Sequence, residues 1–235
     1  PPYLVNADGA LQEWSWPGIA DHYNHRHSSH LLPVWPYMEI TPENDLKLFN
    51  AALTTLGKKD AYNYENAGHG LLHSALIAAN LKNEQAVDGK LLRLTREDFY
   101  YNNLATSHYP KHGTFCTDVC NTVPAIMMEM LVGSSPGILE LLPALPKELD
   151  QGAIADIKGR NQVTVQSLSW NMKTHTVNCT LQSDIDQKIT LIERNSINNI
   201  KTDAKVSPSS LGQIARVIQL KKGVKTNISI RLNNG

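Results

Sequence analysis

The segment Leu141-Leu-Pro-Ala-Leu-Pro-Lys-Glu-Leu-Asp-Gln-Gly152 separates two parts of the sequence that differ in hydrophobic periodicity. Pro143 and Pro146 lack backbone N–H donors, so a helix cannot continue through this segment. Apolar residues before it recur with the 3.6-residue period of helices, whereas those after it alternate with a period of two. We therefore expect a domain boundary here, between residues 1–146 and a smaller domain at 147–235.

The first part is expected to be mainly helical. Its clearest helix spans 41–57, beginning with Thr41 as the N-cap and ending at Gly57. Helical spacing recurs at 71–81, at 86–94 and, after a cap at Thr122, at 123–131. These segments predict several amphipathic helices that pack on one another.

The second part is expected to be a β-domain. Period-two patterns predict strands at 163–170, 176–181, 189–193, 215–220 and 227–232. Residues 171–174 supply the turn of a first hairpin, and short strands at this density favour an antiparallel β-sandwich. The fold class is therefore α+β, with helices followed by a sandwich.

Composition limits the partners that the protein can recruit. The 22 Lys and Arg residues balance the 22 Asp and Glu residues, so no long-range positive field attracts nucleic acid or an anionic membrane. No apolar run approaches the roughly 18 residues of a membrane-spanning helix. The opening Tyr3-Leu-Val5 is typical of the middle of a longer protein, so we expect a fragment without a secretory signal of its own. A neutral or weakly charged ligand is favoured.

Three cysteines do not indicate a disulfide scaffold or a zinc site, because Cys116, Cys120 and Cys179 lack paired Cys-x-x-Cys spacing. We expect buried structural thiols, as free cysteines are commonly buried.

The densest polar and aromatic stretch runs from Leu11 to Trp35. It contains Glu13 and Trp14, then the run His25-Arg-His-Ser-Ser-His-Leu31. Aromatic faces beside charged hydrogen-bonding groups suit a sugar, since C–H faces pack on indole rings while the charged groups bind hydroxyls. A carbohydrate ligand is the preferred interpretation. The histidines His25, His27 and His30 are also compatible with metal ligation or with buried hydrogen bonds.

Two carboxylates are the main candidates for chemistry, because apolar or aromatic neighbours surround Glu13 and Asp118 in the sequence. Asp118 has a simpler alternative role, favouring the N-terminus of the following helix. Glu13 has one too, as a surface residue or a partner of Arg26. His69 and His73 lie one helical turn apart, but adjacent glycines favour a solvent-facing or capping role for them.

The loop before Asp118 supplies further candidates, because His108, Tyr109 and His112 could line the same pocket as that carboxylate.

Four motifs in this order resemble the C-terminal half of glycoside hydrolase family 95, over nearly the whole chain: Leu11-Gln-Glu-Trp14, His25 to Leu31, Thr117-Asp118 before a helix, and Gly137-Ile-Leu-Glu-Leu-Leu-Pro-Ala-Leu-Pro146. The resemblance implies an (α/α)6 barrel flanked by β-domains, and inverting hydrolysis of terminal α-L-fucosides or α-L-galactosides. It also implies a bacterial periplasmic or extracellular setting.

Site roles follow from the same resemblance. Asp118 matches the family's base, and Arg26 and His27 match its sugar-binding pair; Trp14 and His25 are further candidate sugar contacts. The family's general acid lies upstream of the matched region, so Glu13 is the best acidic candidate within the chain, for catalysis or for supporting the pocket. No metal or other cofactor is expected, and the remaining barrel helices must come from an upstream part of the same polypeptide.

Departures from the family leave rival interpretations open. The family's Asp-Gly-Asn-Phe-Gly is here Asp118-Val-Cys-Asn-Thr122, so glycines that allow close backbone approach are replaced by Val119 and Thr122. A carbohydrate-binding homologue without catalysis is the first alternative, and a structural or interaction module is the second.

Overall fold

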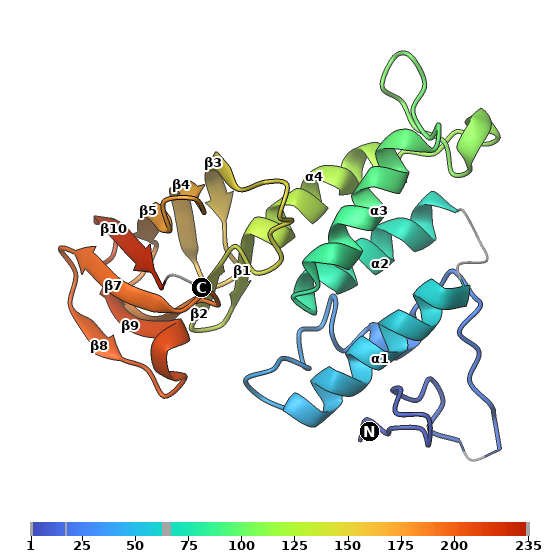
Figure 1. Ribbon diagram of the computed structural model, residues 1–235, viewed down its shortest axis with the longest axis horizontal. Helices are drawn as coiled ribbons and strands as arrows, with labels where there is room; N and C mark the ends of the chain where they lie inside the picture. The colour runs from blue at the N-terminus through green and yellow to red at the C-terminus, as the bar shows by residue number, and fades with distance from the viewer. Residues whose placement is uncertain (1, 17, 63–66, 234–235) are drawn as a thin grey trace. The chain divides into compact units, whose positions relative to one another are not determined.

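The computed structural model describes residues 2–16, 18–62 and 67–233, which form two compact units at 1–130 and 131–235. Figure 1 shows the helices of the first unit and the strands of the second. The division comes earlier than the boundary expected after Pro146. It does so because residues 132–141, next to the proline-containing segment, form strands that join a sheet of the second unit.

The first unit is helical, as predicted. Its elements are η1 (Ser29–Leu31), α1 (Leu46–Tyr62), α2 (Gly68–Asn80), α3 (Glu84–Arg96), η2 (Pro110–His112) and α4 (Asp118–Leu131), the last crossing into the second unit. Helix α2 packs on α3, and α1 contacts η1. None of the helices in the described ranges combines the length and apolar character that a membrane crossing requires. The expected periplasmic or extracellular setting stays a prediction.

Helix α1 begins and ends later than the sequence predicted. The side chains of Thr41 and Asn44 close a turn on each other, since Thr41 N donates to Asn44 Oδ1 at 2.7 Å and Asn44 N donates to Thr41 Oγ1 at 3.3 Å. The capping role passes to Asp45, whose Oδ1 accepts from Leu48 N at 2.9 Å. Gly57 lies inside the helix.

Helix α4 begins earlier than the sequence predicted. It starts at Asp118, so the predicted cap, Thr122, lies inside the helix. Asp118 therefore occupies the first turn, where a carboxylate stabilises the positive end of the helix dipole. This local role, which the sequence suggested, is compatible with a chemical one, since the side chain is 44% exposed.

The second unit contains two five-stranded sheets in its described residues. One sheet has the order β1-β2-β6-β9-β8, from β1 (Val132–Ser135), β2 (Ile138–Leu141), β6 (Gln187–Glu193), β9 (Ala215–Leu220) and β8 (Val206–Pro208). The other has the order β3-β4-β5-β10-β7, from β3 (Gln151–Lys158), β4 (Val163–Asn171), β5 (Thr176–Ser183), β10 (Lys225–Leu232) and β7 (Ile197–Thr202).

Alternating burial identifies an inner face on the sheet that contains β5 and β10. Strand β10 alternates strictly between exposed and buried residues, and β5 buries Val177, Cys179 and Leu181. This pattern is compatible with a β-sandwich. The five predicted strands and the hairpin turn after Asn171 are confirmed. The expectation of purely antiparallel pairing is wrong at one place, where β2 pairs with β6 in parallel.

Candidate active site

Asp118 is held at the N-terminus of α4 with its carboxylate turned toward α2. Its backbone N–H donates to Cys116 Sγ at 3.4 Å, and Asp118 Oδ2 lies 3.6 Å from His69 Nδ1. The carboxylate is therefore both accessible and next to a group that can carry positive charge or donate a hydrogen bond. The sequence-predicted base thus has a partner that the sequence did not indicate.

Imidazole and indole rings form a connected cluster beside this carboxylate. His69 and His73 have ring centroids 4.2 Å apart, and Trp35 lies 5.6 Å from His73. From the loop before η1, His27 approaches His69 edge-on at 5.2 Å, and His25 lies 5.0 Å from His27. The sequence favoured a solvent-facing or capping role for His69 and His73, and it did not predict these ring contacts. Their one-turn spacing puts both rings on the face of α2 that meets this loop.

Electrostatics within the cluster favour a neutral ring at its inner end. Burial lowers the pKa of His73, and the neighbouring His69 and His27 lower it further, with Asp118 opposing them. A neutral imidazole offers one donor and one acceptor, which is a suitable pattern for sugar hydroxyls.

A buried lysine of α1 holds the loop that carries His25, Arg26 and His27. Lys59 is 9% exposed, and its ammonium donates to the backbone carbonyls of His25 and His27, both at 2.8 Å. Burial lowers the pKa of Lys59. On the other side, a Cβ added at Gly70 would lie 3.1 Å from Arg26 Cβ, so the absence of a side chain at Gly70 allows the loop to pack closely on α2.

A pocket of about 310 Å³, lined mostly by polar and charged residues, opens beside this loop. Its lining includes Arg26 from the loop, Lys59 from α1, Ser74 from α2 and Lys90 from α3. Asp60 binds the Lys90 ammonium at 2.7 Å. The pocket therefore offers several hydrogen-bonding groups next to the predicted sugar-binding pair.

Glu13 belongs to a second cluster, at the base of the same loop. Its Oε1 accepts from Ser29 Oγ at 2.5 Å and its Oε2 lies 3.7 Å from His30 Nε2, while its backbone N–H donates to Asp21. His30 is buried, stacks on Tyr23, and has its pKa lowered, chiefly by burial. Ligand atoms of Glu13, Asp21 and His30 lie within 4.8 Å of one another. Glu13 thus contacts groups that support the loop.

Trp14, which follows Glu13, is 47% exposed. Its indole is available to a ligand, although the ring contacts that join His27 to His69 and His73 do not include it.

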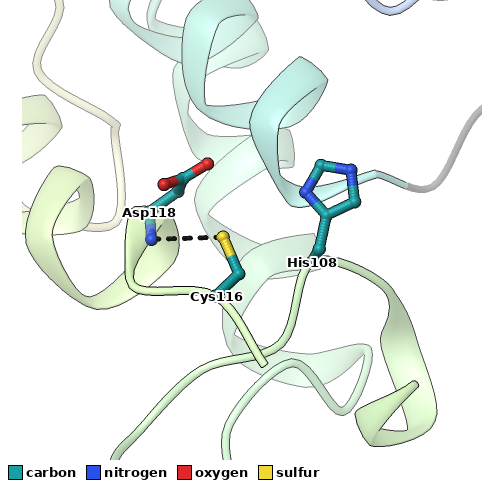
Figure 2. A group of neighbouring side chains, drawn as sticks. All are labelled: His108, Cys116 and Asp118. Carbon is teal, nitrogen blue, oxygen red and sulfur yellow. Dashed lines mark hydrogen bonds between the residues drawn. The ribbon is translucent and has the colours of Figure 1, made fainter. Parts of the chain in front are cut away.

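The segment between α3 and α4 brings two more groups to Asp118. Figure 2 shows the thiol of Cys116 lying between the His108 imidazole and the Asp118 carboxylate. Ligand atoms of these three residues lie within 4.8 Å of one another. Cys116 and Cys120 are only partly buried, so the expectation of buried thiols is correct for Cys179 alone.

His112 and Tyr109 are not part of the group formed by His108, Cys116 and Asp118. His112 pairs with Asp98 at 3.1 Å and stacks on Tyr101. Tyr109 is 44% exposed and contacts His108 edge-on. Of the three loop residues singled out in the sequence, His108 is the one that the structure brings to Asp118.

An accessible carboxylate beside imidazole and indole rings is the kind of site that carbohydrate-active proteins use. Residues 1–131 match the model of the glycosyl hydrolase family 95 catalytic domain, and residues 133–228 match that of the glycoside hydrolase family 95 C-terminal domain. The chain belongs to glycoside hydrolase family 95.

A named relative and a solved structure accompany the family match. Alpha-L-fucosidase 2 from Arabidopsis thaliana is 30% identical over 177 residues, which cover 72% of this chain and 20% of the relative. The chain thus spans about a fifth of that protein's length. A crystal structure of a family 127 beta-L-arabinofuranosidase from Geobacillus stearothermophilus T6 aligns with 79% of this chain and 31% of its own, at 10% identity and a TM-score of 0.33.

Proposed function

We propose that this chain supplies the base side of the active site of a glycoside hydrolase that removes terminal α-L-fucosyl or α-L-galactosyl residues from oligo- or polysaccharides. The observation that carries the proposal is the Asp118 carboxylate, 44% exposed at the start of α4 and 3.6 Å from His69. The family match and the fucosidase relative support the same chemistry.

In the proposed reaction, Asp118 takes a proton from a water molecule that attacks the anomeric carbon from the face opposite the leaving group. A carboxylic acid elsewhere protonates the departing glycosidic oxygen, so the product has inverted configuration. His69, beside Asp118, stabilises the carboxylate before the transfer. The proton count closes because the base gains the proton of water while the acid loses one to the leaving group.

The general acid is proposed to lie in a part of the polypeptide upstream of this chain. Glu13 suits a supporting role better, because its side chain is 16% exposed and its carboxylate is engaged by Ser29 and faces His30. Arg26 and His27 are proposed to bind the sugar hydroxyls, and His25 and Trp14 are proposed as further sugar contacts. Lys59 holds their loop in place.

The helices are proposed to be the last part of an (α/α)6 barrel, completed by helices from upstream. A barrel of twelve helices at a typical length of about 11 to 12 residues needs more chain than the first unit contains. Large apolar side chains that are exposed here, such as Leu46 at 60% and Phe115 at 67%, are available to pack against such helices.

The test is hydrolysis of aryl α-L-fucoside and aryl α-L-galactoside by the full-length protein and its Asp118→Asn variant. We expect kcat to fall by about 100- to 10,000-fold, the usual contribution of a general base. Nuclear magnetic resonance of the first product distinguishes inversion from retention. Asp98→Asn is a matched control, because this exposed carboxylate also pairs with a histidine, His112, but lies outside the ring cluster.

Two outcomes would contradict the proposal. Fucose binding without turnover by the wild type would favour the carbohydrate-binding homologue, which the changes after Asp118 already suggest as the second candidate. Absence of both binding and turnover would favour the interaction module. Calorimetry with fucose and galactose separates these two results.

A further inference from the structure

The segment that joins α3 to α4 holds His108 and Cys116 side by side through backbone hydrogen bonds. Cys116 N donates to Thr106 O at 2.8 Å, and His108 N donates to Thr114 O at 2.7 Å. The carbonyl of His108 in turn accepts from Gly68 N, at the start of α2, at 2.7 Å. These bonds fix the backbone at both positions, so their side chains share one location without any ligand.

Asp118 completes this group from the first turn of α4. The imidazole, thiol and carboxylate offer one nitrogen, one sulfur and one oxygen atom, all within 4.8 Å of one another. All three residues are partly exposed, so an ion in solvent can reach them. In Figure 2 the thiol lies between the other two groups.

We propose that His108, Cys116 and Asp118 bind Zn²⁺. Zinc accepts sulfur, nitrogen and oxygen ligands in tetrahedral geometry, whereas Mg²⁺ and Ca²⁺ select oxygen ligands alone, so the thiol decides the class of metal. Three protein ligands leave the fourth position for water. On binding, the thiol releases its proton to solvent and the sulfur, nitrogen and oxygen atoms each donate an electron pair to the ion.

Neighbouring groups support this set of ligands. The backbone N–H of Asp118 donates to Cys116 Sγ at 3.4 Å. Burial and the Asp118 carboxylate nevertheless raise the pKa of this thiol, so the bound ion has to displace the thiol proton. His69 Nδ1 lies 3.6 Å from Asp118 Oδ2 and can orient the carboxylate by hydrogen bonding to the oxygen that does not bind the metal. Such outer contacts commonly tune metal affinity by about 10- to 100-fold.

The site has a consequence that rests on the proposed function. Zinc bound to Asp118 occupies the carboxylate that is proposed to accept the proton of water. Zinc is then an inhibitor of hydrolysis and not a cofactor. A chelator is expected to restore turnover.

Metal binding is tested first, without reference to activity, by titrating the full-length protein with Co²⁺ as a spectroscopic probe. A thiolate-to-cobalt charge-transfer band is expected in the wild type and in Cys120→Ser, and is expected to be lost in Cys116→Ser. Cys120 is the matched control, because it is also partly buried but its thiol contacts the Thr117 carbonyl. Zn²⁺ is expected to displace the probe, with an affinity at least about tenfold weaker in His108→Ala.

Absence of a thiolate band in the wild type would overturn the site, as would a band that survives Cys116→Ser. Circular dichroism melts check that each variant folds. If Cys116→Ser does not fold, unchanged Zn²⁺ affinity in a folded His108→Ala variant overturns the site by itself.

Turnover of aryl α-L-fucoside with and without Zn²⁺ then tests the consequence. The rate with Zn²⁺ divided by the rate without Zn²⁺ is expected to fall well below one in the wild type and to stay near one in Cys116→Ser. A wild type that shows the cobalt band but no hydrolysis at all contradicts the proposed function and leaves the metal site established. Hydrolysis that Zn²⁺ does not affect, despite the cobalt band, contradicts the inhibitory role alone.

Discussion

Replacing Glu193 by Gln should make the second unit more stable at neutral and alkaline pH. Glu193 ends β6 with 0% of its surface exposed. Its Oε1 accepts from both N and Nδ2 of Asn195 at 2.9 Å, while Oε2 has no hydrogen-bond partner among the described residues. Burial raises the pKa of this carboxyl from its ordinary value of 4.5 to about 7, against the Asn195 donors.

The sign of the effect follows from proton linkage. Because the folded-state pKa is raised, the folded protein binds the proton more tightly than the unfolded chain does. The folding stability that protonated Glu193 contributes is fully present below about pH 4.5 and is lost as the pH rises through 7. At about 1.4 kcal/mol per pKa unit, this difference costs the wild type about 3 kcal/mol above pH 7.

Glutamine keeps the Oε1 acceptor and removes the charge, so its stability should not show this loss. The assay is urea unfolding followed by circular dichroism, for wild type and Glu193→Gln across pH 4.5 to about 8. The difference between the two proteins should grow with pH by about 1 to 3 kcal/mol. Exposed Glu148, changed to Gln, is the control. A difference between wild type and Glu193→Gln that stays constant across this range would refute the reasoning.

Three further substitutions probe the contacts that shape the two units. Lys59→Met leaves two loop carbonyls without their donor and should cost about 1 to 3 kcal/mol, measured by urea unfolding, whereas Lys58→Met removes a partly exposed ion pair and should cost under about 1 kcal/mol. Gly152→Ala places a Cβ 2.5 Å from the Trp170 ring, so we expect a loss of about 1 to 3 kcal/mol and a lower thermal midpoint. Asn161→Ala removes the 2.7 Å hydrogen bond to a β2 carbonyl and should cost about 1 to 3 kcal/mol; equal stability in a urea titration would count against that contact.

Local signals were sufficient for much of the secondary structure. The strands at 163–170 and 227–232 and the helices at 71–81 and 86–94 are confirmed, because periodic burial is encoded in neighbouring residues. Helix ends were predicted less well. Thr41 and Thr122 resemble caps, but Thr41 bonds to Asn44 while Asp45 caps α1, and α4 begins at Asp118.

For the candidate site too, the sequence predicted individual residues and did not predict their contacts. Sequence motifs predicted Asp118, Arg26 and His27 as candidate site residues, and the groups that contact them come from distant parts of the chain. His69 faces Asp118 only because α2 and α4 bring them together, and Lys59 meets the carbonyls of the His25–His27 loop across many intervening residues. No local pattern marks a buried lysine whose acceptors are backbone atoms.

What the sequence determined by itself is the α+β class, the change of period at the proline-containing segment and the family's motifs, because all of these depend on residue types at short spacing. The tertiary structure decided the pairing of β2 with β6, the ring cluster beside Asp118 and the approach of His69 to Asp118. These depend on contacts between distant segments. Such contacts form only when burial of the helix and sheet faces compensates for the entropy lost in closing the chain between them.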